Sequence, residues 1–127
     1  GLFDLLLHGG TQGTDPVTVL EQVREEIAVL HPPAWHRFPH AFTHIFSGGY
    51  AAGYYSYLWA EVLAADGFAR FAEAGLVDRA TGDLFRAEVL ARGAARPAVD
   101  SFRAFRGRDA DPAAMLERYG LLPEPAA

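Results

Sequence analysis

The chain has 127 residues, of which 50% are hydrophobic, so it is long enough to bury a core as one domain or as one lobe of a larger protein. Its formal net charge is −5 and every cation is an arginine, which argues against non-specific nucleic-acid binding because such binding needs a basic surface. The absence of cysteine excludes disulfides and thiolate metal sites, and it is compatible with a cytoplasmic protein.

The chain begins with an apolar run, GLFDLLLHGG. This run is shorter than the roughly 18 residues that span a bilayer, and it lacks the basic start and cleavage site of a signal peptide, so we expect no membrane partner. Asp4 interrupts the run and Gly9-Gly10 closes it, which favours a short strand or extended segment over Leu2–Leu7. Because the first residue is Gly rather than Met, we expect the sequence to be a piece of a longer polypeptide.

Helical signals follow in the rest of the first half. After a polar turn at 11–14, Asp15-Pro16 supplies an N-cap and then proline at the first helical position, so we predict a helix over residues 16–30. Apolar residues recur along it at helical spacing, at Leu20, Val23, Ile27 and Leu30. Pro32-Pro33 ends this helix, and a second one is predicted from about Pro39 until just before Gly48-Gly49.

Four helices separated by glycine and proline are predicted for the second half. A long helix covers about 51–74 with Gly75 as its C-terminal cap, and others cover 81–92, 97–106 closed by Gly107, and 111–119. We expect the tail after Gly120 to be frayed. The predicted fold class is therefore mainly α, with one short extended segment at the start.

The stretch HIFSGGYAAGYYSYLW, which begins at His44, contains four tyrosines and three glycines. On a helix, Tyr50, Tyr54 and Tyr57 share one face, and Glu61 continues it. The aliphatic residues fall on another face, at Leu58, Val62 and Ala65. Neutral phenol hydroxyls are good donors, and two that converge can stabilise a developing oxyanion. The spacing equally fits tyrosines that line a helix interface with their hydroxyls in water, so both interpretations stay open.

Three histidines stand four residues apart, at His36, His40 and His44. Histidines at i and i+4 of one helix can share a metal such as zinc, but Pro39 interrupts the helix between the first two, and no Glu follows His40. The spacing therefore leaves three interpretations open: a metal site, another role in a site, or a structural role.

Other features are interpreted as structural. Arg103, Arg106 and Arg108 surround a predicted helix C-terminus, where cations complement the helix dipole. Phe68 and Phe71 are predicted to lie in the core. Gly48-Gly49 permits positive φ or a close approach to a ligand, although an ordinary turn uses the same pair.

The stretch FPHAFTHIFSGGYAAGYYSYLWAEVLAADGFARF closely resembles the C-terminal catalytic region of the thimet-oligopeptidase family of zinc metallopeptidases, in particular its bacterial oligopeptidase branch. The motif H-x-x-x-G-G-Y-x-A-x-Y-Y-x-Y carries the resemblance, which extends over essentially the whole chain, from GLFDLLLH to ARGAARPAVDSFRAFRGRDADPAAMLERYGLL. The resemblance implies that the chain is the C-terminal helical part of a two-lobed enzyme, which encloses a deep channel and cleaves short peptides.

The resemblance also implies roles for particular residues. Residues matching His44, Tyr50 and Tyr57 face the zinc across the cleft and contact the substrate backbone and the tetrahedral oxyanion, with Tyr54 as a further contact. The glycines before Tyr50 belong to a loop that adjusts around the substrate.

Three further residues are assigned to substrate binding, namely Gly48, Gly49 and His40. Gly48 and Gly49 are the glycines of the adjusting loop. His40 keeps three possible roles: it supports His44, binds substrate, or fills the fold.

Family members hold zinc with the two His of an H-E-x-x-H helix and a distant Glu, and this sequence contains no H-E-x-x-H. We therefore expect the zinc ligands and the catalytic Glu in the upstream part of the same polypeptide, and none of the metal ligands in residues 1–127, a single C-terminal catalytic-lobe fragment. We predict that this fragment alone neither binds the catalytic zinc nor hydrolyses peptides. The alternatives are a non-catalytic peptide-binding domain and a purely structural helical module.

Overall fold

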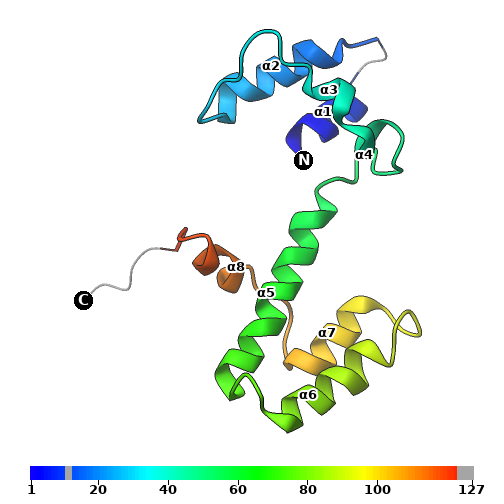
Figure 1. The fold of residues 1–127 in the computed structure, drawn as a ribbon. Coiled ribbons are helices and arrows are strands. Elements are labelled where there is room, and N and C mark those ends of the chain that lie inside the picture. The colour runs from blue at the N-terminus through cyan, green and yellow to red at the C-terminus, as the bar shows by residue number, and fades with distance from the viewer. Residues whose placement is uncertain (11–12, 123–127) are drawn as a thin grey trace. The chain divides into compact units, whose positions relative to one another are not determined.

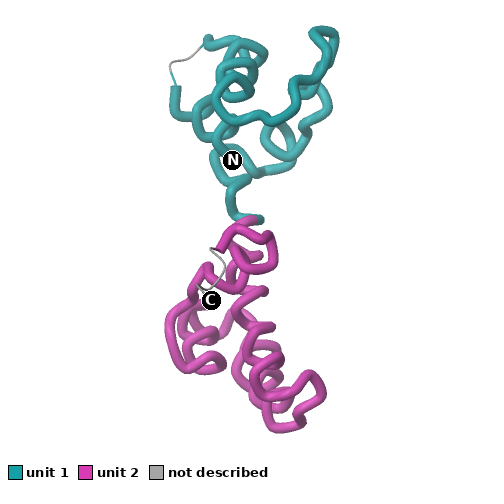
Figure 2. Tube along the Cα trace, turned by 90° about the vertical axis from the view of Figure 1, so that its left-hand side faces the viewer, with its two compact units in different colours: residues 1–57 teal, residues 58–127 magenta. Residues whose placement is uncertain are grey.

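The computed structural model describes residues 1–10 and 13–122 and divides the chain into two compact units, Gly1–Tyr57 and Leu58–Ala127 (Figure 2). Every regular element in the described part of the chain is a helix, which confirms the predicted mainly α fold class. None of these helices combines the length and the apolarity that crossing a lipid bilayer requires. Part of the predicted turn at 11–14 and most of the predicted frayed tail lie outside the described residues.

The described residues of unit 1 form these helices before the start of α5 (Figure 1): α1 (Leu2–Gly9), α2 (Pro16–Ile27), α3 (Phe38–Ala41) and α4 (Thr43–Phe46). The predicted N-cap of α2 is confirmed, because the Asp15 carboxylate accepts hydrogen bonds from the Thr18 N–H at 2.9 Å and from the Thr18 hydroxyl at 2.8 Å. The helix ends earlier than predicted, because Ala28 adopts an extended conformation with ψ 127°. Leu30 consequently lies beyond the helix and is 84% exposed.

The extended segment predicted over Leu2–Leu7 is wrong, because this stretch forms α1. Its apolar residues include no β-branched side chain, and leucine is a strong helix former. Phe3 and Leu7 are four residues apart and so share one helix face, which packs into the core of unit 1. The isolated charge of Asp4 is wholly buried in the same helix.

The core of unit 1 joins α1 and α2 to the segment that carries α3 and α4. Its buried members are Phe3, Val19, Leu20, Val23, Phe42 and Ile45, with Leu7 and Tyr54 packed against them. The single helix predicted from Pro39 onward is broken at Phe42, whose φ of −88° and ψ of 66° leave the helical region. The buried Phe42 ring meets the Tyr54 ring edge-on at 4.7 Å between centroids, so the break packs an aromatic side chain of this segment into the core.

Unit 2 begins inside the long helix α5 (Ser56–Ala74) and contains all of it except its first two residues. Its other elements are α6 (Arg79–Phe85), a π-helical turn (Arg86–Leu90), α7 (Ala98–Arg106) and α8 (Ala113–Arg118). The predicted C-terminal caps are confirmed: Gly75 has φ +110° and Gly107 has φ +83°, and each N–H donates a 2.8 Å hydrogen bond to a carbonyl of the preceding turn. The helix predicted over 81–92 is formed instead by α6 and the π-helical turn.

Three phenylalanines form the aromatic core of unit 2. The ring centroids of Phe71 and Phe85 each lie within 5.8 Å of the ring of Phe105, which is only 1% exposed. Phe71 thus packs as predicted, whereas Phe68 is 58% exposed, so its predicted place in the core is wrong.

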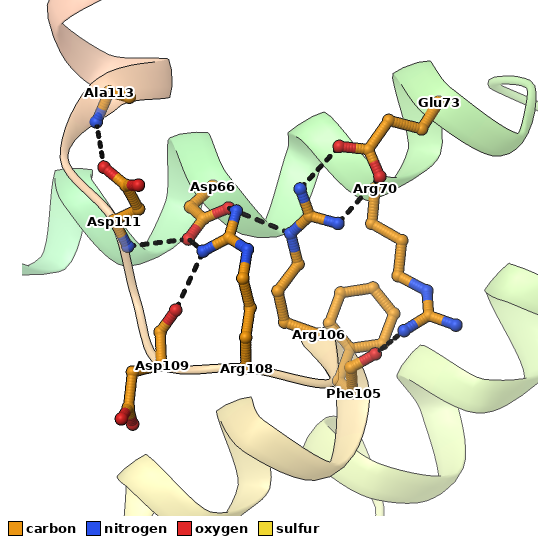
Figure 3. A network of polar contacts seen from close by, with 9 residues as sticks. All are labelled: Asp66, Arg70, Glu73, Phe105, Arg106, Arg108, Asp109, Asp111 and Ala113. Carbon is orange, nitrogen blue, oxygen red and sulfur yellow. Dashed lines mark hydrogen bonds and ion pairs between the residues drawn. The ribbon is translucent and has the colours of Figure 1, made fainter.

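A buried carboxylate ties the segment after α7 to α5 (Figure 3). Asp66 is 0% exposed and accepts hydrogen bonds from Arg106 Nε at 2.9 Å, from both Arg108 Nη atoms at 2.7 and 2.6 Å, and from the Asp111 N–H at 2.8 Å. Arg106 also forms a bidentate pair with Glu73. Burial raises the pKa of Asp66, but the hydrogen bonds from the two arginines and the N–H outweigh it and hold the pKa below its usual value. The carboxylate is therefore ionised at neutral pH.

Candidate functional site

The candidate site is carried by the loop between α4 and α5. The Gly48 N–H donates to the Thr43 carbonyl at 2.8 Å, and the Tyr50 N–H donates to the His44 carbonyl at 3.0 Å. A Cβ at position 48 would lie 2.9 Å from the Cα of His44, closer than real Cβ atoms come, and Gly49 has φ +79°. Both glycines are therefore required by the loop conformation itself, and the close approach at Gly48 is to the backbone of His44.

The residues just before α5 form turns instead of the predicted first turns of the long helix. Ala52 has φ +54°, in the left-handed region that residues with a side chain rarely adopt. Its N–H donates to Asp4 Oδ1, and the N–H of Tyr54 donates to Asp4 Oδ2, both at 2.9 Å. Because these amides bond to a carboxylate from α1 rather than to helix carbonyls, α5 begins only at Ser56.

The loop brings one histidine and three tyrosines together in the His–Tyr cluster, which consists of His44, Tyr50, Tyr54 and Tyr57. The His44 ring centroid lies 5.9, 5.4 and 6.2 Å from those of the three tyrosines, in that order. Tyr57 lies 5.4 Å from Tyr50, with ring planes 27° apart, and 5.2 Å from Tyr54. Tyr50 is 37% exposed and Tyr57 49%. The three tyrosines that the spacing placed on one face thus lie together, although a loop and not a continuous helix brings them to each other and to His44. Their catalytic roles stay a prediction.

The interaction of the Tyr57 hydroxyl with the Tyr50 side chain, followed by partial burial and by the repulsion from Tyr50 and Tyr54, raises the pKa of Tyr57 above the ordinary tyrosine value. Tyr57 therefore keeps its proton at neutral pH and can act as a hydrogen-bond donor.

Asp4 supports this loop and is the residue that sequence reasoning missed. Burial raises the pKa of Asp4, but the hydrogen bonds from the N–H groups of Tyr54 and Ala52 lower this pKa. His8 also lowers the pKa, because its Nδ1 lies 2.8 Å from Asp4 Oδ1. The net pKa is below the usual value, so the carboxylate is charged at neutral pH. The signal was the lone acidic residue inside LFDLLL, because a charge in an apolar helix face is either exposed or fully partnered.

The three histidines spaced four residues apart have different surroundings, and His44 is the one in the His–Tyr cluster. His36 Nδ1 lies 2.9 Å from Nη2 of Arg24. His40 lines a pocket of about 230 Å³ with Asp15, Pro16, Val17, Pro39 and Phe46. Across residues 1–10 and 13–122, no three His, Asp or Glu side chains are grouped so that they could hold a metal ion.

Glu61, which the spacing aligned with the tyrosines, has a different partner. It belongs to unit 2 and accepts a 2.7 Å hydrogen bond from the Tyr119 hydroxyl. This bond is the largest cause of the raised pKa of Tyr119. The predicted aliphatic face of α5 is confirmed at Ala65, which is buried, and is wrong at Leu58, which is 57% exposed.

Comparison with known proteins identifies the family to which this chain belongs. Residues 1–121 match the model of peptidase family M3. Oligopeptidase A of Escherichia coli (strain K12) is 52% identical over 124 residues, which cover 95% of this chain and 18% of that protein. Oligopeptidase A of Haemophilus influenzae is 43% identical over 125 residues, 96% of this chain and 18% of that protein. Dipeptidyl carboxypeptidase of Escherichia coli (strain K12) is 45% identical over 68 residues, 54% of this chain and 10% of that protein.

The chain thus spans less than a fifth of the length of the oligopeptidases A that it matches. The match to the family model includes the whole loop that carries the His–Tyr cluster. The resemblance drawn from the motif, to the thimet-oligopeptidase family and its bacterial oligopeptidase branch, is confirmed. The chain belongs to peptidase family M3.

Proposed function

We propose that this chain is part of a zinc-dependent oligopeptidase that hydrolyses peptide bonds in short peptides, and that it supplies the His–Tyr cluster to the active site. Membership of peptidase family M3 and the similarity to proteins named oligopeptidase A and dipeptidyl carboxypeptidase support this proposal. The chain spans less than a fifth of those oligopeptidases, and the partners in this proposal are short peptide substrates and the upstream part of the same polypeptide.

The observation that carries the proposal is the convergence of His44, Tyr50, Tyr54 and Tyr57 on one another at the surface of unit 1. A cluster that only packs a core would use Phe or Leu, which leave no hydroxyl to satisfy. Here Tyr50 and Tyr57 are each more than a third exposed. Such an arrangement presents phenol donors to a ligand.

In peptide hydrolysis, a water oxygen bonds to the carbonyl carbon, the carbonyl oxygen takes up negative charge, and the C–N bond then breaks as the amine takes up a proton. In this proposal His44, Tyr50 and Tyr57 contact the substrate backbone and the charged oxygen, and Tyr54 is a further contact. The proton that Tyr57 retains makes it a donor to that oxygen. Donors fixed in advance at a developing charge are effective because they need no reorganisation during the reaction.

Substrate binding extends to three further residues. Gly48 and Gly49 belong to the loop that adjusts around the peptide, since glycine tolerates backbone conformations that other residues do not. The pocket beside His40, of about 230 Å³, is proposed to take part of the substrate.

The described residues do not fit a zinc site, because no three His, Asp or Glu side chains among them are grouped around one point. The sequence also contains no H-E-x-x-H. We therefore assign the zinc ligands and the Glu that activates water to the upstream part of the polypeptide, as the resemblance implies. A protein without cysteine in this segment suits the reducing cytoplasm, where we propose that the enzyme acts.

Tyr57→Phe in the full-length enzyme, assayed on an internally quenched peptide, tests the proposal. We expect kcat to fall by about 10²–10³-fold, as when one oxyanion donor is lost. KM should change little, because this contact strengthens only in the transition state. Tyr55→Phe is the matched control, because it removes the hydroxyl of a neighbouring exposed tyrosine outside the His–Tyr cluster. Equal kcat values for the two variants would refute the proposed role.

A further inference from the structure

Asp4 is a fully buried, charged side chain whose partners are mainly groups of the active-site loop. Its two carboxylate oxygens accept the N–H groups of Ala52 and Tyr54, which are 48 and 50 residues away in the sequence. Both hydrogen bonds are 2.9 Å long. The carboxylate thus connects α1 to the loop, and each of its oxygens accepts one of the two amides.

The bonded amides lie where the loop backbone is least favourable. Ala52 adopts φ +54° although it has a side chain, so this turn needs an external partner to persist. A charged carboxylate accepting from a backbone N–H forms a stronger hydrogen bond than a neutral acceptor does. Asp4 therefore stabilises the one conformation of the loop in which both amides point towards α1.

The effect reaches the phenols through Tyr54. The N–H of Tyr54 is bonded to Asp4, and its ring lies 5.4 Å from His44 and 5.2 Å from Tyr57 between centroids. Tyr57 in turn stacks on Tyr50 at 5.4 Å. Fixing the backbone at Tyr54 therefore restricts the positions of every ring in the His–Tyr cluster.

We propose that Asp4 is a positioning residue of the oligopeptidase active site: from α1, its buried carboxylate holds the loop in the conformation that sets the hydroxyl groups of Tyr50 and Tyr57 against the substrate. This inference rests on the proposed function. Asp4 is 0% exposed, so it does not touch substrate and acts only through the loop. His8 is the third partner of the carboxylate, with its Nδ1 2.8 Å from Oδ1.

A double-mutant cycle in the full-length enzyme tests this role. Asp4→Asn keeps the shape of the side chain but can accept only one of the two N–H groups, because its NH₂ faces the other. We expect kcat to fall roughly 10- to 100-fold, as for a small misplacement of catalytic groups, with KM within about threefold. In a Tyr57→Phe background the same substitution should lower kcat by less than about threefold, since residues that act through one another are not additive.

Asp66→Asn is the matched control, because Asp66 is the wholly buried aspartate of unit 2 and lies outside the loop. Its effect on kcat should be the same in the wild-type and Tyr57→Phe backgrounds. An Asp4→Asn effect that is equally large in both backgrounds would overturn the positioning role, because it would show a general loss of folded enzyme.

Amide hydrogen exchange of the wild-type enzyme tests whether Asp4 holds the loop, even if the Asp4→Asn variant folds poorly. The amides of Ala52 and Tyr54 should exchange at least about 10-fold more slowly than unprotected amides of the same sequence. Unprotected exchange at both positions would overturn the inference. A Tyr57→Phe enzyme with unchanged kcat would instead overturn the proposed function, and slow exchange at these two amides would then still support Asp4 as the residue that holds the loop.

Discussion

Each unit contains a wholly buried aspartate, and the two have different partners. Asp66 in unit 2 is paired with the guanidinium groups of Arg106 and Arg108 and with one backbone N–H (Figure 3). Asp4 in unit 1 contacts no guanidinium group of residues 1–10 or 13–122: it accepts two loop N–H groups and contacts the imidazole of His8. The same chemical group thus joins helical segments through ion pairs in one unit and, in the other, fixes the loop of the His–Tyr cluster through backbone amides.

The aromatic clusters differ in the same way. Phe71, Phe85 and Phe105 meet around a ring that is 1% exposed and carry no polar atom on their side chains. In the His–Tyr cluster every side chain carries a polar atom, and Tyr50 and Tyr57 are more than a third exposed. Packing alone explains the phenylalanines, whereas the exposed phenols beside the glycine loop are the basis of the binding surface proposed above.

The largest effect is expected at Asp66, because Asp66→Asn leaves two arginines without their buried carboxylate. We expect the free energy of unfolding of the full-length enzyme at pH 7 to fall by about 3 kcal/mol, measured by denaturant titration. Glu73→Gln is the control, since Glu73 is an exposed member of the same network and its loss should matter much less. Equal losses for the two variants would show that burial of the carboxylate is not decisive.

The stability difference between wild type and Asp66→Asn should depend on pH, because folding lowers the pKa of Asp66. The pKa of Asp66 is lower in the folded chain than the ordinary value of 3.8, so its stabilising contribution is fully present above that value and is lost as the pH falls through the folded pKa. The difference in stability between wild type and Asp66→Asn should therefore be constant from about pH 5 to 8 and shrink below about pH 4. A difference that grows towards low pH would contradict the sign of the shift.

A smaller effect, on catalysis, is expected for Gly48→Ala. The added Cβ would lie 2.9 Å from the Cα of His44 and 3.0 Å from its carbonyl oxygen, and backbone atoms cannot rotate away. The loop must shift, so kcat should fall roughly 10- to 100-fold. Gly53→Ala is the matched control, because its Cβ would meet only ordinary contacts, the nearest at 3.6 Å, and should leave kcat within about threefold. Wild-type kcat in Gly48→Ala would argue against a catalytic role for the loop conformation that Gly48 permits.

Local signals in the sequence predicted much of the fold. The Asp15-Pro16 start of α2 and the glycines after α5 and α7 are confirmed, because caps depend on one or two neighbouring residues. The wrong prediction of an extended segment over Leu2–Leu7, which forms α1, has a long-range origin instead. Asp4 looked like an interruption of an apolar run, and its actual partners come from a loop 48 and 50 residues later.

The spacing predicted that the three tyrosines of the cluster share a surface, but not how the chain brings them together. The spacing of Tyr50, Tyr54 and Tyr57 suggested one helix face, yet Ala52 with φ +54° precludes a continuous helix there. The loop that carries the rings is bonded to Asp4 of α1, a long-range contact that no periodic pattern records. Glu61 fitted the same spacing and has a different partner, Tyr119, which confirms that spacing alone did not define the cluster.

The central claim is that the phenols of unit 1 recognise a charged oxygen that exists only in the transition state. The most direct measurement compares how Tyr57→Phe changes the affinity of the full-length enzyme for a phosphinic peptide, whose tetrahedral oxygen carries charge, and for an uncleaved amide peptide of the same sequence. We predict that the phosphinic peptide binds roughly 100-fold more weakly while the amide peptide changes less than about threefold. Equal weakening of both ligands, or no change in either, would contradict the account.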